Sequence, residues 1–377
     1  MKKLLIASAV SALFAAPATV LAQAKPPAAP TLDKVLEASG ISVSGYIDVA
    51  YTHADRNIEA GIPAGSVTPV AERVFDNQNN SFALHQFGLT VAKQPKEGFG
   101  GLVNLTAGKD AQVMQSSPAA VNATFDVTQA YMQYATGPLT VIAGKYVTMH
   151  STEVIASTGN TNFSRSILFG AVPFTHTGVR ATWALSDQVS LMAGVNNGWD
   201  QLTDQNKGKT AELGAALNPI KPLTITLSAM SGKEGTAPNE GTRTSLNAVA
   251  SYTIIDPLSV GLEVLSVSQD NFTSLVNAST IKAKYSGVAG YVTYMFAPKF
   301  RGVVRVESFN DKDGFHFGTA DTKYKEVTLT GAFLASDSFE ARVEGRRDQA
   351  TNTVFTDYAG AASKTMTSIA LQGLYKF

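Results

Sequence analysis

Residues 364–377 read Lys-Thr-Met-Thr-Ser-Ile-Ala-Leu-Gln-Gly-Leu-Tyr-Lys-Phe, and this stretch decides the fold. Ile369, Leu371, Gly373, Tyr375 and Phe377 occupy alternate positions, with mixed or polar residues between them. A period of two predicts an extended strand that has one apolar face. Such a strand at the end of a chain leaves a free edge unless it pairs, and pairing with the first strand removes both edges of the sheet. The stretch therefore predicts the last strand of a closed barrel.

The composition of the chain fits a barrel and excludes several kinds of site. Charged residues make up 16% of the 377 residues, below the roughly 25% of ordinary soluble chains. Lys+Arg and Asp+Glu both number 30, so no strong field attracts nucleic acid. Cysteine is absent, which rules out thiol catalysis, cysteine metal sites, disulfides and a lipid anchor on cysteine. Composition alone remains compatible with a soluble β-rich protein.

The N-terminus predicts secretion. A basic start, Met1-Lys2-Lys3, precedes an apolar run over residues 4–16, and small residues allow cleavage after Ala22 or after Ala24. We expect a signal peptide over residues 1–22, too short to anchor the chain. Residues 23–40 then form a periplasmic tether whose short helix candidate, 31–39, docks at the barrel mouth or assembles with copies of itself. No later apolar run reaches the length of about 18 residues that a membrane helix needs.

From residue 41 to residue 377 the pattern has a period of two and predicts an all-β, antiparallel, 16-stranded transmembrane barrel. The predicted strands are 41–53, 82–93, 99–109, 124–136, 139–149, 174–185, 188–196, 209–217, 222–231, 243–254, 258–269, 281–296, 299–309, 325–335, 338–347 and 364–377. Short turns and long polar loops alternate along the whole series. A soluble sandwich has no reason to place every long loop at one end, whereas an outer-membrane barrel does.

Wherever the parity of a predicted strand is clear, its charged residues lie opposite the apolar face. A basic side chain on the lipid face near the bilayer midplane costs about 2–4 kcal/mol, so these charges are expected in the lumen. For strand 139–149 the apolar pattern is ambiguous, and the same cost assigns Lys145 to the lumen, which turns Tyr146 outward. Aromatic residues at lipid-facing strand ends predict an interfacial girdle, formed by Tyr51, Trp183, Tyr252, Tyr294, Phe296, Phe339, Tyr375 and Phe377.

Several short motifs resemble the beta-barrel porin-2 family of Gram-negative bacteria. They are Gly45–Asp48, Gln129–Tyr131, Ala143–Lys145, Glu153–Ile155, Asn162–Ser166 and Pro173–Arg180. The resemblance is densest over residues 41–185, and it implies an outer-membrane channel with no catalytic residue. The aromatic terminus, with Tyr375 and Phe377, resembles the sorting signal of outer-membrane barrels. It implies that the barrel-assembly machinery is a partner.

The residues for catalysis or for cofactor binding are largely missing. The five histidines are scattered, with no two at a metal-ligand spacing, and no nucleophile elbow exists. Residues 206–210 echo the end of a phosphate-binding loop, but Thr203 stands where its first glycine should be. The pair His150-Ser151 leaves a membrane hydrolase open as a third reading. We expect no enzyme activity, no metal and no cofactor.

The long loop 150–173 is the candidate constriction. In general porins, which this architecture resembles, the loop between the fifth and sixth strands folds into the barrel. We hypothesise that Glu153 and Arg165 on this loop face a wall that carries Asp48, Lys145 and Arg180, so that opposed charges set a transverse field. The alternative is that these residues pair as salt bridges that stiffen the barrel. A second mixed-charge wall is expected from Arg305, Glu307, Glu340, Arg342, Glu344 and Arg346.

The sequence thus predicts a passive porin for ions and small hydrophilic solutes in the outer membrane of a Gram-negative bacterium. Sixteen strands enclose an aqueous lumen. The alternatives are a substrate-selective channel and a plugged barrel with a structural or adhesive role. Outer-membrane lipid and lipopolysaccharide are expected partners, nucleic acid is not, and similarity to general porins favours a homotrimer.

Overall fold

The computed structural model describes residues 31–58, 73–119, 123–236, 240–274 and 276–377. The predicted signal peptide and the tether up to Pro30 lie outside these residues. Helix α1 (Leu32–Ser39) occupies the predicted position and lies in a first unit that ends at Ser39. Residues 40–377 form the second unit. No helix among the described residues has the length and the apolar character that a membrane crossing requires.

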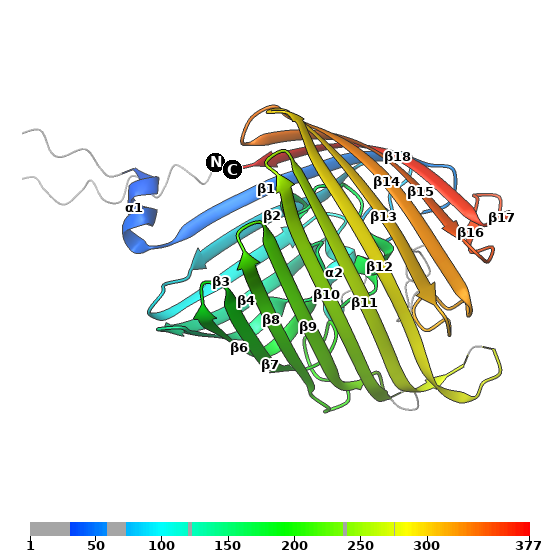
Figure 1. Cartoon of the computed structure of the whole chain (residues 1–377), viewed down its shortest axis with the longest axis horizontal. Coiled ribbons are helices and arrows are strands. Elements are labelled where there is room, and N and C mark those ends of the chain that lie inside the picture. Colours follow the sequence, from blue (N-terminus) through cyan, green and yellow to red (C-terminus); the bar gives the residue numbers. More distant parts are fainter. Residues whose placement is uncertain (1–30, 59–72, 120–122, 237–239, 275) are drawn as a thin grey trace, which may run out of the picture. The chain divides into compact units, whose positions relative to one another are not determined.

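The second unit is one closed antiparallel barrel (Figure 1). Its strands are β1 (Ser42–Ala54), β2 (Ser81–Lys93), β3 (Gly98–Ala107), β4 (Phe125–Thr136), β5 (Leu139–Val147), β6 (Thr175–Ser186), β7 (Val189–Asn196), β8 (Thr210–Ile220), β9 (Leu223–Glu234), β10 (Gly241–Ile255), β11 (Leu258–Thr273), β12 (Thr280–Ala297), β13 (Phe300–Asp311), β14 (Thr322–Leu334), β15 (Phe339–Ala350) and β18 (Thr365–Lys376). The prediction of sixteen strands is confirmed, and no bound differs by more than four residues from the predicted one.

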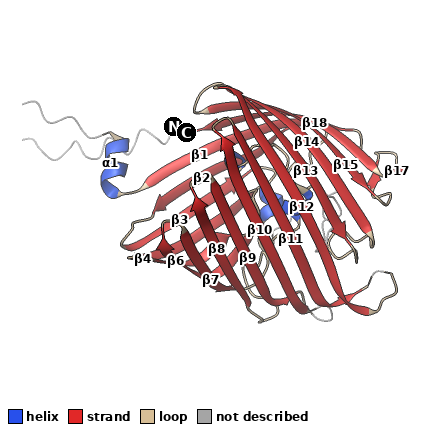
Figure 2. Cartoon of the chain, viewed as in Figure 1, coloured by secondary structure: helices blue, strands red, loops and turns tan. Residues whose placement is uncertain are grey.

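The connections contain the remaining elements. Two short helices, α2 (Ala111–Met114) and α3 (Ile167–Gly170), and the 3₁₀ turn η1 (Ser157–Gly159) interrupt the long loops. Strands β16 (Phe355–Thr356) and β17 (Ala362–Ser363) form a two-stranded sheet within the last long loop. Figure 2 shows these short helices among the strand ribbons of the barrel.

The first and last strands close the barrel, as the terminal stretch predicts. β1 pairs with β18 from Tyr46 opposite Lys376 to Ala54 opposite Ser368. Beyond this ladder, the N–H of Gly45 donates to the carbonyl oxygen of Phe377 at 2.8 Å, and the N–H of Phe377 donates back at 2.9 Å. The terminal aromatic residue therefore extends the seam by a reciprocal pair of backbone bonds.

The predicted faces are largely confirmed. The girdle residues Trp183, Tyr252, Tyr294, Phe296, Phe339, Tyr375 and Phe377 are exposed on the outer wall, while Tyr51 is only partly exposed. On β15 the buried inward residues Glu340, Arg342, Glu344 and Arg346 alternate with outward apolar residues from Phe339 to Gly345. The cost of placing charge in lipid explains this separation.

The predicted outward orientation of Tyr146 is wrong. Its side chain is 1% exposed, and its hydroxyl donates to Glu212 at 3.0 Å inside the barrel. Lys145 is also buried, with its ammonium 3.1 Å from the Asp126 carboxylate. The prediction relied on the cost of a basic side chain in lipid and on strict alternation, whereas here both neighbours are buried, Lys145 with Asp126 and Tyr146 with Glu212. The parity argument therefore did not decide the orientation of Tyr146.

Candidate functional site

The loop between β5 and β6, residues 148–174, folds into the barrel, as predicted for a constriction. Its α3 helix contacts β12 and β13, and η1 contacts β18. Most of its side chains are buried, and Thr152, Val154, Thr158 and Gly159 remain exposed. The loop therefore packs against one side of the barrel interior and presents a short exposed edge.

Inward carboxylates hold the loop backbone at three places. Glu307 on β13 accepts from the N–H groups of residues 167 and 168 at 2.8 and 2.5 Å. Glu344 on β15 accepts from the N–H groups of residues 163 and 164 at 2.7 and 2.9 Å. Glu263 on β11 accepts from the N–H of Thr152 at 2.9 Å. Hydrogen bonds to a charged acceptor are stronger than neutral ones, so these contacts fix the loop position.

Inward arginines bind the loop carbonyl oxygens. Arg342 donates to the carbonyls of residues 160 and 162 at 2.8 and 3.0 Å. Arg346 donates to the carbonyl of Arg165 at 2.7 Å. Arg305 donates to the carbonyl of residue 164 and to the Glu153 carboxylate, at 2.8 and 2.7 Å. The mixed-charge wall of β13 and β15 thus pairs with both the donors and the acceptors of the loop backbone.

The loop is also braced internally by the two residues predicted to line the constriction. Glu153 accepts from the N–H and hydroxyl of Ser166 at 2.7 and 2.6 Å. The Ser166 hydroxyl in turn accepts from the N–H of Phe169 and caps α3. The guanidinium of Arg165 donates to three loop carbonyls, those of Val154, Ile155 and Phe163. Both Glu153 and Arg165 are buried.

An apolar cluster lies beneath the loop, inside the barrel. Ile167, Leu168 and Phe169 of α3 are almost fully buried in one cluster with the inward side chains Leu265, Val267, Ala283, Tyr285 and Phe309 of β11–β13. The Tyr285 hydroxyl donates to the carbonyl of Ala171 at 2.7 Å. This apolar interior was not predicted. The sequence did contain a signal for it, because Leu265 and Val267 have the same parity as the inward residue Glu263.

The start of the loop is attached by His150, a residue to which the sequence gave no structural role. Its two ring nitrogens lie 2.7 Å from the Ser228 hydroxyl and 2.8 Å from the Ser245 hydroxyl. Burial lowers the pKa of His150 to about 3, helped by the nearby His176 and Arg180. The Ser151 hydroxyl donates to Glu263 at 3.0 Å rather than to His150, so the two residues that suggested a hydrolase do not form a pair.

The remaining predicted residues have partners on the barrel wall. The Arg180 guanidinium donates to both oxygens of Glu212 at 2.8 and 2.9 Å and lies over the Tyr146 ring. Asp48 accepts from the side chain of Gln372 at 2.8 Å, and Glu340 accepts from Arg342 at 2.6 Å. The structure thus brings Glu153, Arg165, Arg305, Glu307, Arg342, Glu344 and Arg346 together at the loop, and Asp48 also hydrogen-bonds to Ser157 of the loop, while Lys145, Arg180 and Glu340 form other contacts. An effect of any of them on a passing solute stays a prediction.

Sequence reasoning missed two further polar anchors. Asp200 accepts from the N–H groups of residues 174 and 175, both at 2.8 Å, at the end of the loop. Burial raises its pKa to about 7, although these hydrogen bonds act in the opposite direction. Arg73 donates to Asp348 at 2.6 Å and to Asp76 at 2.8 Å. These residues lie in long loops or at a strand end near them, where no periodicity marks them.

Beside the Arg180–Glu212 pair, strands β6 and β7 also carry uncharged inward side chains. Met192 and Thr182 have partly exposed inward positions on β7 and β6. A side chain at Gly214 would meet the Met149 sulfur and the Met192 methyl group, so two thioethers lie together over this glycine. Within the described residues no group of His, Asp and Glu side chains has the arrangement of a metal site.

Solved structures of outer-membrane proteins share the barrel fold. The outer-membrane channel DcaP of Acinetobacter baumannii matches with a TM-score of 0.60 and 13% identity, over 89% of this chain and 97% of that one. A trimer form of the Vibrio cholerae outer-membrane protein OmpT matches with 0.59 and 11%, over 89% and 99%. An anion-selective porin from Comamonas acidovorans matches with 0.60 and 9%, over 89% and 99%. At these identities the likeness shows the fold.

The family assignment comes from the sequence match. No curated protein matches the chain. The family model described as "Putative beta-barrel porin-2, OmpL-like" matches residues 40–377, the whole of the barrel unit. The chain belongs to this porin family and is a channel of the Gram-negative outer membrane.

Proposed function

We propose that loop 148–174 sets the width of a passive channel for ions and small hydrophilic solutes. The observation that carries this proposal is the double anchoring of the loop, by carboxylates at its N–H groups and by arginines at its carbonyl groups. A loop held in this way keeps a fixed cross-section, because moving it leaves buried charges unpaired.

The test is deletion of residues 155–170 with measurement of single-channel conductance. We expect the conductance to rise, because the deletion removes α3 and η1 from the interior. The matched control deletes residues 352–361 from the last long loop. An unchanged conductance after the first deletion, with a folded barrel, rules out the loop as the constriction.

The buried apolar cluster favours one alternative, a plugged barrel that binds a partner through its loops. Phe309, Phe315 and Tyr324 continue this cluster toward the long-loop side. Such a barrel would give no conductance steps in planar bilayers, whereas a porin gives them. A substrate-selective channel would instead show liposome-swelling rates that differ sharply among sugars, amino acids and dicarboxylates.

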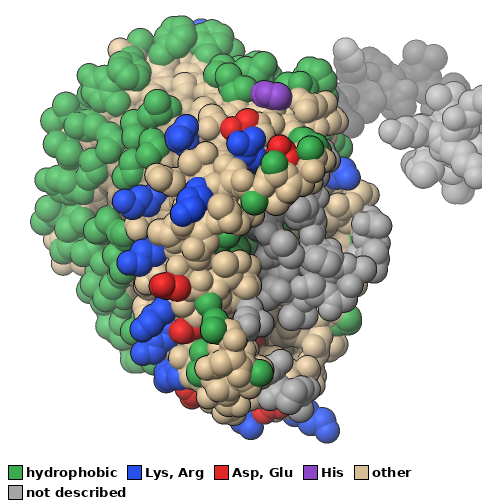
Figure 3. Space-filling model, turned by 90° about the vertical axis from the view of Figure 1, so that its right-hand side faces the viewer, with side chains coloured by type: hydrophobic (Ala, Val, Ile, Leu, Met, Phe, Trp, Pro, Cys, Tyr) green, Lys and Arg blue, Asp and Glu red, His purple; other side chains and the backbone are tan. Residues whose placement is uncertain are grey.

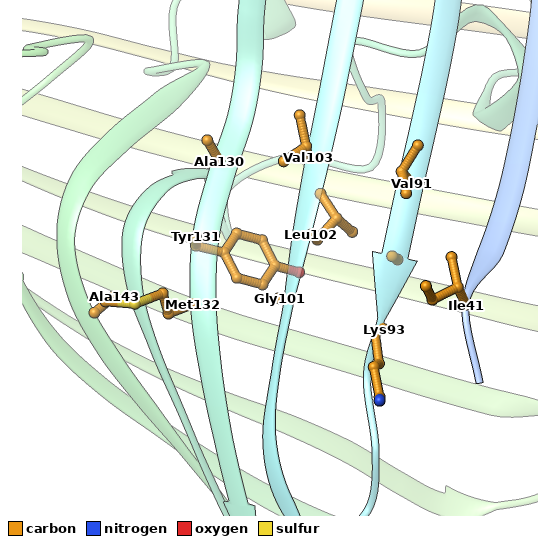
Figure 4. Close-up of a pocket in the computed structure, with 11 residues that line it drawn as sticks. Ile41, Val91, Lys93, Gly101, Leu102, Val103, Ala130, Tyr131, Met132 and Ala143 are labelled. Carbon is orange, nitrogen blue, oxygen red and sulfur yellow. The ribbon is translucent and has the colours of Figure 1, made fainter. Parts of the chain in front are cut away.

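We propose a homotrimer with its interface on the outer wall of β2–β5. This wall has a shallow, mainly apolar groove of about 560 Å³ whose lining includes the small residues Gly101, Ala130 and Ala143 besides Val103 and Met132 (Figure 4). Small side chains let two backbones approach closely. The trimer form of the similar OmpT supports this state.

Single cysteines test the trimer, because the chain has none of its own. We expect Met132→Cys to cross-link subunits in mild detergent and Leu227→Cys, which is exposed on β9, to leave them uncross-linked. Equal cross-linking of both variants would reject this interface. For assembly we propose the barrel-assembly machinery as the partner that reads Tyr375 and Phe377. The lipid partners follow from the membrane location.

A further inference from the structure

Five basic side chains gather on the outer wall at the loop-side ends of three strands. They are Lys282 and Lys284 on β12, Lys323 and Lys325 on β14, and Arg347 on β15, and we call them the basic patch. Each is exposed and alternates with buried inward residues, such as Tyr285 next to Lys284 and Tyr324 next to Lys323. The patch therefore points away from the lumen.

The strand register brings the members of the patch close together. Lys325 lies opposite Ser308 on β13 and Gln349 on β15, and Val327, two residues along, lies opposite Arg347. Diagonal neighbours on adjacent strands are about 7–8 Å apart at most. Figure 3 shows Lys and Arg side chains along the border between the hydrophobic surface and the polar loop surface.

The patch lies directly beside the apolar band of the barrel. Val288, Val327 and Val343 are exposed on the same three strands, and Val306 on the intervening β13, all further from the loops. Along these strands toward the long loops, apolar residues come first and basic residues follow. In the outer leaflet the acyl chains give way to headgroups in the same direction. The patch is therefore at the height of lipid headgroups.

The positive charge of the patch is partly compensated on β12, where the backbone N–H of Lys284 donates to the Asp313 carboxylate at 2.8 Å. Among the described residues, Lys282 is the member with an ion pair, to Asp270 at 3.2 Å, and both side chains are about half exposed. An exposed pair of this kind contributes little. At the same height on other strands, the outer wall carries Phe82, Phe125 and Val195. Lys233 on β9 is also exposed at a loop-side strand end, and it pairs with Glu240 at 2.9 Å.

We infer that the basic patch binds the phosphate groups of lipopolysaccharide in the outer leaflet. The inference rests on the outer-membrane location and assigns a site to the lipid partner. Clustered lysines and an arginine attract anionic headgroups, and arginine holds phosphate in a bidentate geometry. The apolar residues beneath the patch contact the acyl chains of the same molecule. Lipopolysaccharide thereby fixes which sector of the barrel faces lipid.

The test measures binding of fluorescent lipopolysaccharide to the full-length mature protein in detergent. The variant replaces Lys323, Lys325 and Arg347 with Gln. The matched control replaces three exposed turn lysines at the other end of the barrel, Lys96, Lys221 and Lys299, with Gln. A second probe is the same lipopolysaccharide after enzymatic removal of its phosphates. Heat-modified gel mobility and single-channel conductance check that each variant is folded and open.

We expect the patch variant to bind at least about tenfold more weakly, because it loses three positive charges that face anionic headgroups. The control variant should bind like the wild type, and dephosphorylated lipopolysaccharide should bind wild type as weakly as the patch variant binds the intact molecule. Unchanged binding by the patch variant, equal loss in the control, or indifference to phosphate removal each overturns the assignment. Conductance should be the same in all three proteins, so a failed binding test leaves the channel function standing.

Discussion

Single carboxylates inside this barrel each hold two consecutive backbone N–H groups. Glu344 serves residues 163 and 164 and also accepts from the Thr330 hydroxyl at 2.7 Å. Replacing Glu344 with Ala leaves these donors buried without an acceptor, at a cost of about 3 kcal/mol. We therefore predict that Glu344→Ala makes loop 148–174 sensitive to protease in folded protein.

A control for this prediction lies at the other end of the barrel. Glu97 accepts from the N–H of Gly137 at 2.8 Å in an exposed turn. Its replacement by Ala should leave protease sensitivity unchanged, since water can substitute for the lost acceptor. Resistance of the loop in Glu344→Ala would show that the other anchors suffice.

The state of His150 predicts a response to acid. Burial lowers its pKa to about 3, below its ordinary value of about 6.5. A depressed pKa contributes stability that is complete above pH 6.5 and is lost as the pH falls toward 3. We predict that the conductance of the wild type becomes noisier over this range, as the imidazolium leaves the site between Ser228 and Ser245.

The non-titrating variant His150→Gln isolates this effect. It should show little change between pH 6.5 and pH 3, because its amide can hydrogen-bond to one serine without taking up a proton. Asp200 responds to acid in the opposite direction. Its pKa is raised to about 7, so the folded protein favours its protonated form and acid adds stability at this residue. An identical acid response in both proteins would assign the effect to other groups.

At the scale of elements, the strands were predictable and the loops were not. A strand between lipid and lumen must alternate outward and inward side chains. The sequence alone therefore indicates which residues from Glu340 to Ala350 face inward. The interior contacts of the long loops have no period, because each depends on residues that are distant along the chain. Arg73 and Asp348 illustrate this, being 275 residues apart.

The candidate site was therefore predicted in its residue types and only partly in its arrangement. Parity assigns Glu307, Glu344 and Arg346 to the inner face, and in the structure they are buried against loop 148–174. Parity cannot show that these side chains hydrogen-bond to the backbone of the loop. It also failed at Tyr146, where two neighbouring residues are both buried with polar partners.

The terminal strand β18 supports a prediction that separates closure from recognition. The backbone of Phe377 makes two hydrogen bonds to Gly45, and its ring stacks on Phe87 with centroids 6.4 Å apart. The Phe377→Ala variant retains the backbone bonds and loses the ring. We predict that it refolds in detergent with a small loss of thermal stability and reaches the outer membrane at strongly reduced levels.

The matched control for this variant is Phe339→Ala, which removes an exposed girdle ring from β15. It should lose similar stability and keep normal membrane levels, because it leaves the terminus intact. Equal membrane levels for Phe377→Ala and wild type would remove the sorting role of the terminal aromatic residue.

At the scale of the whole molecule, the charges inside the barrel are mostly paired with each other or with loop backbone. Arg180 with Glu212, Lys145 with Asp126 and Arg305 with Glu153 and Glu326 illustrate this pairing. A paired charge has a short-ranged field, so it acts weakly on an ion in the aqueous passage. The sequence left two hypotheses: the charges set a transverse field, or they form salt bridges that stiffen the barrel. The two predict different ion selectivity after one partner of a charge pair is removed.

Removing the negative partner of Arg180 is the decisive change. We predict that the wild type has a reversal potential near zero in a potassium chloride gradient, while Glu212→Gln shifts it toward anions. A unit charge about 8 Å from an ion contributes about 0.5 kcal/mol in water, which corresponds to roughly a twofold change in permeability ratio. The amide still accepts from Arg180, so the guanidinium stays in place while its charge is exposed. Glu97→Gln, in an exposed turn, should leave the potential unchanged. An unshifted potential in Glu212→Gln would mean that Arg180 acts only as a structural link between β6 and β8.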